Sequence, residues 1–244
     1  SAVVHGAVRG HDAFRILFGT AILAAGLVAL LVGRLPETTT AEAEAAASPR
    51  LGGFPRELRG RLAIVMAVTA AAGAISGPAS GLAFVYAENY LKLHPATVST
   101  VVVLSAIPGV LGLVLGRRLA DVAGRRAAVA VGVLGAAGTS LLAYSGGAPA
   151  FICGYVVGVF AGGLFAPGAA ALATEPFPTS VRASAGGWIV VAAVLGGLVG
   201  ILVFCVVADA ANSTLVAGLA AFLPGLPVLV ALRRLPETKG LALT

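Results

Sequence analysis

The stretch GGWIVVAAVLGGLVGILVFCVV, residues 186–207, contains no charged side chain and no strongly polar one. A helix needs about 20 consecutive, mainly apolar residues to cross the hydrocarbon core of a bilayer. This stretch is long enough and apolar enough to do so. It therefore predicts one transmembrane helix.

Six further runs of the same kind lie at residues 14–33, 62–86, 97–116, 127–145, 149–173 and 214–232. The chain of 244 residues is 59% hydrophobic and 11% charged, and its mean hydropathy is +1.01. An average globular domain is nearer ~45–50% apolar and ~25% charged, so this chain has too little polar surface to cover a soluble domain. Its 33 glycines are typical of helices that pack closely in lipid. We predict an all-α membrane protein of about seven transmembrane helices, with the lipid bilayer as its first partner.

The net charge of +6 does not indicate nucleic-acid binding, because the basic residues lie in short connections and not in a patch with aromatic residues. If the runs alternate across the membrane, Arg9, Arg15 and Lys92 fall on one side and the other 13 basic residues fall on the opposite side. Cytoplasmic connections carry an excess of Lys and Arg, so we expect this second side to be cytoplasmic. It includes the C-terminus. The Ala-, Gly- and Arg-rich composition suggests a bacterial gene, and hence an inner membrane.

The pentapeptide RLPET occurs twice, at residues 34–38 and 234–238, each time after an apolar run. Six crossings separate the copies, so both are expected on the cytoplasmic face. One explanation is a good helix stop used twice, in which Arg reaches the headgroups and Pro ends the helix. The other is an internal repeat of six spans, as in transporters built from two related halves.

The short connection GRRLADVAGRR, residues 116–126, combines four arginines with one acidic residue between two glycines. We expect a tight cytoplasmic turn, in which Asp121 accepts hydrogen bonds from arginines or lies near a helix N-terminus. Gly124 would allow the backbone to reverse. The simpler alternative is a positively charged anchor whose carboxylate neutralises part of the charge.

This connection resembles the signature loop of the major facilitator superfamily, which links the second and third helices of each six-helix half. Arg117 and Val122 depart from the pattern of that loop, and the remaining key positions match it: Leu119, Ala120, Asp121, Gly124, Arg125 and Arg126.

A second stretch, TEPFPTSVRASAGG at residues 174–187, resembles the segment between helices ten and eleven in the sugar, organic-ion and aromatic-acid branches of that family. The matching positions are Glu175, Phe177, Pro178, Thr179, Arg182, Ala183 and Gly187. The closing RLPETKG resembles the tail after helix twelve in the same branches. The three motifs occur in the family's order and together extend over residues 34–240.

The resemblance implies that the chain contains helix six and the C-terminal six-helix half of a twelve-helix fold. The expected units are an external segment with the last helix of the N-terminal half, a cytoplasmic linker, the six-helix half and a cytoplasmic tail, at residues 1–33, 34–60, 61–232 and 233–244. The first five helices would then lie outside this chain. We expect a fragment whose partner is the missing N-terminal half or a second copy.

The same resemblance implies a secondary active transporter that moves a small-molecule substrate by alternating access, with protons as the expected coupling ion of a symporter. The residues that it assigns to cytoplasmic gating are Gly116, Asp121, Gly124, Arg125, Arg126, Glu175, Pro178 and Arg182. No ionisable residue lies deep within a predicted span. A proton-binding carboxylate would therefore belong to the missing helices.

Thr69, Ser76 and Ser80 are spaced by seven and four positions, so they share one face of a helix. We consider them, together with Tyr155, a candidate substrate pathway, with Tyr86, Asn89 and Tyr90 at the outer mouth. The alternative is that each hydroxyl donates to the backbone of its own helix.

The chain shows no sequence pattern of a membrane-embedded enzyme, such as an HExxH pair or a nucleophile site. Cys153 and Cys205 lack metal-ligand spacing, so we expect neither a metal nor a cofactor. The competing function is that of a half-length helical module that dimerises or acts as a scaffold and transports nothing itself.

Overall fold

The computed structural model describes residues 19, 22, 25–31, 54–223 and 225–234, and its regular elements within these ranges are all helical. Three of them bring the chain to the end of its first span: α4 (Arg56–Gly81), the short α5 (Ala83–Val85) and the π-helical turn η2 (Tyr86–Tyr90). The remaining elements are α6 (Pro95–Val122), α7 (Arg125–Ala143), α8 (Ala148–Thr174), α9 (Thr179–Ala211), α10 (Thr214–Phe222) and α11 (Gly225–Leu232).

Six stretches of the described chain are long and apolar enough to cross a membrane. They are Arg56–Tyr90, Pro95–Val122, Arg125–Ala143, Ala148–Thr174, Val181–Ala211 and Thr214–Leu232. This finding confirms the predicted all-α architecture with helices long and apolar enough to span a membrane, and it agrees with six of the seven expected spans. The seventh expected span, residues 14–33, lies largely outside the described residues. Its described part includes residues 25–31, which are helical. Most of the expected linker and tail also lies outside them.

Three helices begin or end at least six residues beyond the runs expected for them, and α9 does so by beginning at Thr179. The α6 helix continues through Val122, so most of the 116–126 connection is helical and only Ala123 and Gly124 separate α6 from α7. The α4 helix begins at Arg56, inside the expected linker, directly after Pro55 and with Glu57 in its first turn. Proline directly before a helix and an acidic residue in the first turn both favour a helix start.

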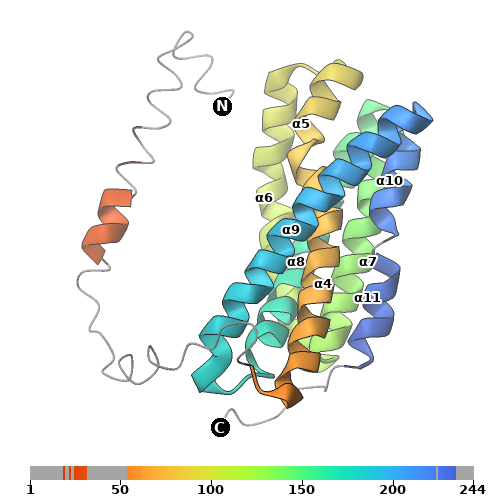
Figure 1. The fold of residues 1–244 in the computed structure, drawn as a ribbon. Coiled ribbons are helices and arrows are strands. Elements are labelled where there is room, and N and C mark those ends of the chain that lie inside the picture. The colour runs from red at the N-terminus through yellow and green to blue at the C-terminus, as the bar shows by residue number, and fades with distance from the viewer. Residues whose placement is uncertain (1–18, 20–21, 23–24, 32–53, 224, 235–244) are drawn as a thin grey trace.

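The spans alternate in direction, so that α4, α7 and α9 begin at the end of the bundle where α6, α8 and α11 finish (Figure 1). Every arginine of the described chain lies at this end, and Lys92 lies at the other. We call the first the arginine end. This distribution is the one expected from alternation of the runs across a bilayer.

Close packing at glycines holds three helix pairs together: α4 with α9, α6 with α8, and α7 with α8. A Cβ atom on Gly77 would lie 2.5 Å from the Gly197 carbonyl oxygen, and one on Gly116 would lie 2.6 Å from that of Leu164. A Cβ atom on Gly132 would lie 2.6 Å from the Phe165 Cα. These distances leave no room for a side chain. The three pairs can therefore pack this closely only because these positions are glycine.

Two clusters of buried side chains occupy the bundle on either side of its middle. The cluster nearer the arginine end contains Phe54, Val65 and Phe177, each 1% exposed. The cluster at the opposite end is aromatic and contains Tyr86, Tyr144, Phe151 and Phe204. In it, the Tyr144 hydroxyl donates a hydrogen bond of 2.6 Å to the carbonyl oxygen of Pro78, within α4.

Replacing Gly116 by alanine should destabilise the protein, because the new methyl group would meet the backbone of Leu164 on α8. We expect a loss of about 1–3 kcal/mol, typical of overpacking, in the free energy of unfolding. Gly138 is the matched control, since a Cβ atom there would meet no heavy atom within 4 Å. Gly138→Ala should be neutral or stabilising by up to about 1 kcal/mol, because alanine is the better helix former. Unfolding by sodium dodecyl sulfate in mixed micelles measures both variants, and equal effects would contradict the packing role of Gly116.

Candidate functional site

The connection between α6 and α7 is the tightest turn at the arginine end. Gly124 has φ +100°, a conformation that side-chain-bearing residues rarely adopt, so glycine is required where the chain reverses. The reversal places Asp121, in the last turn of α6, four residues before Arg125 at the start of α7. The two side chains can therefore meet across the turn.

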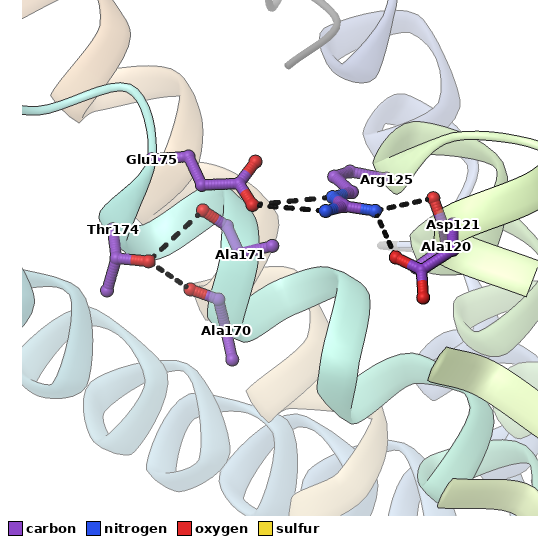
Figure 2. Close-up of polar contacts among 7 residues, drawn as sticks. All are labelled: Ala120, Asp121, Arg125, Ala170, Ala171, Thr174 and Glu175. Carbon is purple, nitrogen blue, oxygen red and sulfur yellow. Dashed lines mark hydrogen bonds and ion pairs between the residues drawn. The ribbon is translucent and has the colours of Figure 1, made fainter. Parts of the chain in front are cut away.

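Arg125 connects this turn to the end of α8 (Figure 2). Its Nη1 donates hydrogen bonds of 2.7 Å to the Asp121 carboxylate and 2.8 Å to the Ala120 carbonyl oxygen. Its Nε and Nη2 each lie 3.4 Å from one Glu175 carboxylate oxygen. We call Asp121, Arg125 and Glu175, with the Ala120 carbonyl, the Arg125 cluster. The predicted motif residues from two separate connections thus meet in space.

Burial differs sharply between the two carboxylates of the Arg125 cluster. The Asp121 side chain is 58% exposed, whereas those of Arg125 and Glu175 are 19% and 18% exposed. Water therefore screens the Asp121 contact well and the Glu175 contact less. The ion pair with Glu175 is longer but better shielded, so a break there would change the local electrostatics more.

The other predicted gating residues lie outside the Arg125 cluster. Gly116 packs against α8, and Pro178 is exposed directly before the first residue of α9. The Arg182 Nε donates a 3.3 Å hydrogen bond to the Phe177 carbonyl oxygen, near the start of its own helix. Arg126 follows Arg125 on α7 and is half-buried. The sequence could not identify the Ala120 carbonyl oxygen as an acceptor, because every residue carries a backbone carbonyl group.

Two adjoining cavities lie between the α4–α9 pair and the α7–α8 pair, and we call them together the groove. The larger has a volume of about 370 Å³ and the smaller about 190 Å³. Both are lined by Ile75, Ser76, Ala136 and Gly162, so they are continuous. Of the predicted pathway residues, Thr69 and Ser76 line the larger cavity, and Ser76, Ser80 and Tyr155 line the smaller.

The hydroxyls predicted to line the pathway also bond to the backbone, as the alternative held. Ser80 donates to the Ser76 carbonyl oxygen at 2.7 Å, and Ser76 donates to that of Gly73 at 3.2 Å. Thr69 Oγ1 lies 3.0 Å from the Val65 carbonyl oxygen. Each hydroxyl can both bond to its own helix and line the pathway, because a hydroxyl that donates its proton still presents lone pairs to a cavity.

Tyr86 and Asn89 do not occupy the open mouth expected of them. The Tyr86 ring is only 5% exposed and meets the Tyr144 ring edge-on at a centroid distance of 4.9 Å. Asn89 is exposed in η2, and neither residue lines the groove. The α4 helix is interrupted at Leu82 and a π-helical turn begins at Tyr86, so spacing along α4 does not extend to these positions.

The sequence reasoning missed most of the groove lining, including one polar residue, Ser140 on α7, and three aromatic residues: Tyr144 directly after α7, and Phe151 and Phe165 on α8. Their helices read as uniformly apolar, so no periodic pattern distinguishes the groove side from the lipid side. Burial raises the pKa of the Tyr144 phenol above its ordinary value, so this group stays neutral and remains a donor.

Among the described residues, no group of three or more His, Cys, Asp and Glu side chains could hold a metal ion. The two cysteines, Cys153 and Cys205, are both free and exposed.

No protein-family model matches the chain, and no curated protein matches it either. The resemblance to the major facilitator superfamily therefore stays a prediction, carried by residues 116–126 and 174–187 and by the RLPET segments.

Replacing Arg125 by leucine should destabilise the protein by about 1–3 kcal/mol, because it leaves the sheltered Glu175 carboxylate without its ion pair. Asp121→Asn should cost only about 0–1 kcal/mol, since that carboxylate is 58% exposed. Arg117→Leu, an exposed arginine at the same end, controls for the loss of charge and should change the free energy of unfolding by about 0.5 kcal/mol or less. Thermal unfolding in detergent measures all three. An Arg125→Leu effect no larger than that of Arg117→Leu would refute the bridging role.

Proposed function

We propose that this chain is part of a secondary transporter that moves a small solute across a membrane by alternating access. The observation that carries the proposal is the Arg125 cluster, which ties the α6–α7 turn to the C-terminal end of α8 through one guanidinium group. The groove is bordered on one side by α7 and α8, whose ends this cluster joins, and on the other side by α4 and α9. A breakable contact between helix ends beside a cavity is what an alternating-access protein needs.

The physics of the Arg125 cluster supports a reversible contact. Its longer pair measures 3.4 Å, and one of its carboxylates is exposed to water. Such an ion pair can break and let water hydrate its charged groups at a modest cost in free energy, whereas a fully buried pair could not. A gate has to open and close within a few kcal/mol, so this intermediate burial suits the role.

The finer assignments extend the same proposal. The chain would be helix six and the C-terminal half of a major facilitator carrier, coupled to protons, in a bacterial inner membrane. The arginine end would face the cytoplasm, because basic residues are enriched on that side. Arg233 and Arg234 follow α11 at the arginine end, so the C-terminus would also be cytoplasmic.

A half-length module that dimerises is the second candidate, and one observation favours it. Two helices carry long apolar faces that the described bundle leaves uncovered, exemplified by Val103 and Ile107 on α6 and by Val194 and Val206 on α9, each more than half exposed. A second copy of the chain would cover part of these faces. The missing half of a carrier, or lipid, would cover them equally well.

Asp121→Asn tests the gating role. We expect the loss of the carboxylate to free Arg125 on one side and to open the arginine end. A cysteine placed at Ser76, with Cys153 and Cys205 changed to serine, would then react with an impermeant maleimide at least about threefold faster in inside-out vesicles. Asp209→Asn, an exposed acid at the opposite end, is the matched control. Unchanged labelling, together with unchanged uptake from a panel of aromatic acids, organic ions and neutral ring compounds, would overturn the assignment.

The mass of the protein in its native membranes separates the two candidates. An antibody against residues 34–60 should detect a band well above 24.0 kDa if the six-helix unit belongs to a twelve-helix carrier. A band at 24.0 kDa, with a native mass near twice that value in detergent, would instead support the dimerising module.

A further inference from the structure

The groove is uncharged. Its lining, which comes wholly from the described residues, contains no Asp, Glu, Lys, Arg or His side chain. It consists mainly of Gly, Ala, Val and Ile, with Phe165 in the larger cavity and Phe151 in the smaller. An ion that enters such a site loses its hydration and gains no counter-charge from these helices, so a net charge on the ligand is strongly disfavoured.

The serine hydroxyls of the groove face it mainly as acceptors. Ser140 donates to the Ala136 carbonyl oxygen at 2.7 Å, and Ser76 and Ser80 donate to carbonyl oxygens of α4. Each hydroxyl has one proton to donate and two lone pairs. Because the proton is already used, the lone pairs are what remains for a ligand. A ligand that carries a hydrogen-bond donor would therefore satisfy them.

Tyr155 adds the groove's one tyrosine hydroxyl that makes no hydrogen bond within the described part of the chain. The side chain is half-buried, and its ring lies 5.9 Å from the Phe151 ring, centroid to centroid. The Tyr144 hydroxyl, by contrast, already donates to the Pro78 carbonyl oxygen. Tyr155 thus offers a ligand both an aromatic face and a polar group.

The groove has room for a molecule of one or two rings. Its larger cavity, about 370 Å³, falls within the usual range of roughly 300–1,000 Å³ for ligand pockets. Glycines keep it open: a Cβ atom at Gly162 would meet no heavy atom within 4 Å. Gly154 and Gly158, on the same helix, also line the smaller cavity, but there a Cβ atom would meet Thr139.

We infer that the groove binds an uncharged, mainly apolar ring compound that carries a hydroxyl or another hydrogen-bond donor. The inference rests on the proposed function, since it names the class of solute that the transporter would carry. It follows from four features together: the absence of charge in the lining, the acceptor oxygens of the serines, the free Tyr155 hydroxyl and the volume.

The test is equilibrium dialysis of the purified full chain in lipid nanodiscs, with partition into empty nanodiscs subtracted. Three probes share one ring system: 2-naphthol is neutral and donates a hydrogen bond, 2-methoxynaphthalene cannot donate, and 2-naphthoate is an anion at neutral pH. We expect saturable binding of 2-naphthol. The methoxy compound should bind about threefold to tenfold more weakly, as the loss of one hydrogen bond implies. The anion should bind weaker still, by about tenfold or more.

Variants locate the site. Gly162→Leu should fill the groove and reduce 2-naphthol affinity by about tenfold or more. Gly138→Leu adds the same side chain where there is also no heavy atom within 4 Å, but outside the groove, and should leave the affinity unchanged. Tyr155→Phe should weaken 2-naphthol by about threefold to tenfold and leave 2-methoxynaphthalene less affected. If Gly162→Leu does not fold, the Tyr155→Phe variant alone still tests whether 2-naphthol binds in the groove.

Binding of 2-naphthoate as tight as that of 2-naphthol would overturn the inference. So would equal affinities of Gly162→Leu, Tyr155→Phe and the unaltered protein. Dialysis requires no transport, so the two proposals can fail separately. Selective 2-naphthol binding without any uptake by the parent protein would refute only the transport function. Uptake of naphthoate without 2-naphthol binding would refute only the ligand class.

Discussion

The close approach of helix backbones at glycine is the constraint on which the rest of the structure depends. Lipid is as apolar as leucine, so helices in a bilayer gain little from hiding apolar side chains and associate through packing instead. In this protein the backbones approach closely where Gly77 faces Gly197 and where Gly116 and Gly132 meet α8. These contacts join α4 to α9 and join α6 and α7 to α8. The remaining surfaces between the two sets are looser, and the groove lies there.

Polar interactions between different helices lie mainly towards the ends of the bundle. At the arginine end, the Arg125 cluster connects two helix termini, where backbone carbonyls such as that of Ala120 are available. Towards the other end, Tyr144 bonds to Pro78 across helices. Between them, the hydroxyls of the groove mostly donate within their own helices. The middle of the bundle is therefore apolar but lined with unused lone pairs, a combination that suits a neutral ligand better than an ion.

Arg125 is the point at which fold and proposed mechanism meet. It is the first residue of α7, directly after Gly124, whose positive φ makes the reversal possible. The tightness of that turn brings Asp121 within 2.7 Å, and the packing of α7 on α8 brings Glu175 to the other side. The same guanidinium therefore contacts both the turn and the end of α8. A movement of α8 relative to α7 would change the distance between Arg125 and Glu175 first.

The amino-acid sequence by itself determined that the chain is helical, where its six described spans lie to within a few residues, and that Gly124 turns the chain. These features depend on local quantities: the length of an apolar run, the position of proline and glycine, and the backbone freedom of one residue. Only the tertiary structure decided that a Cβ atom at Gly162 would enter open space while one at Gly154 or Gly158 would meet Thr139, and that Tyr86 is buried. It also decided that Arg125 reaches Glu175, fifty residues away along the chain, whereas Arg182 bonds near the start of its own helix. The physical reason is that the spans are apolar on every face. The residue pattern of such a helix does not indicate how the helix is rotated about its own axis. Only packing against neighbouring helices determines which side faces the groove.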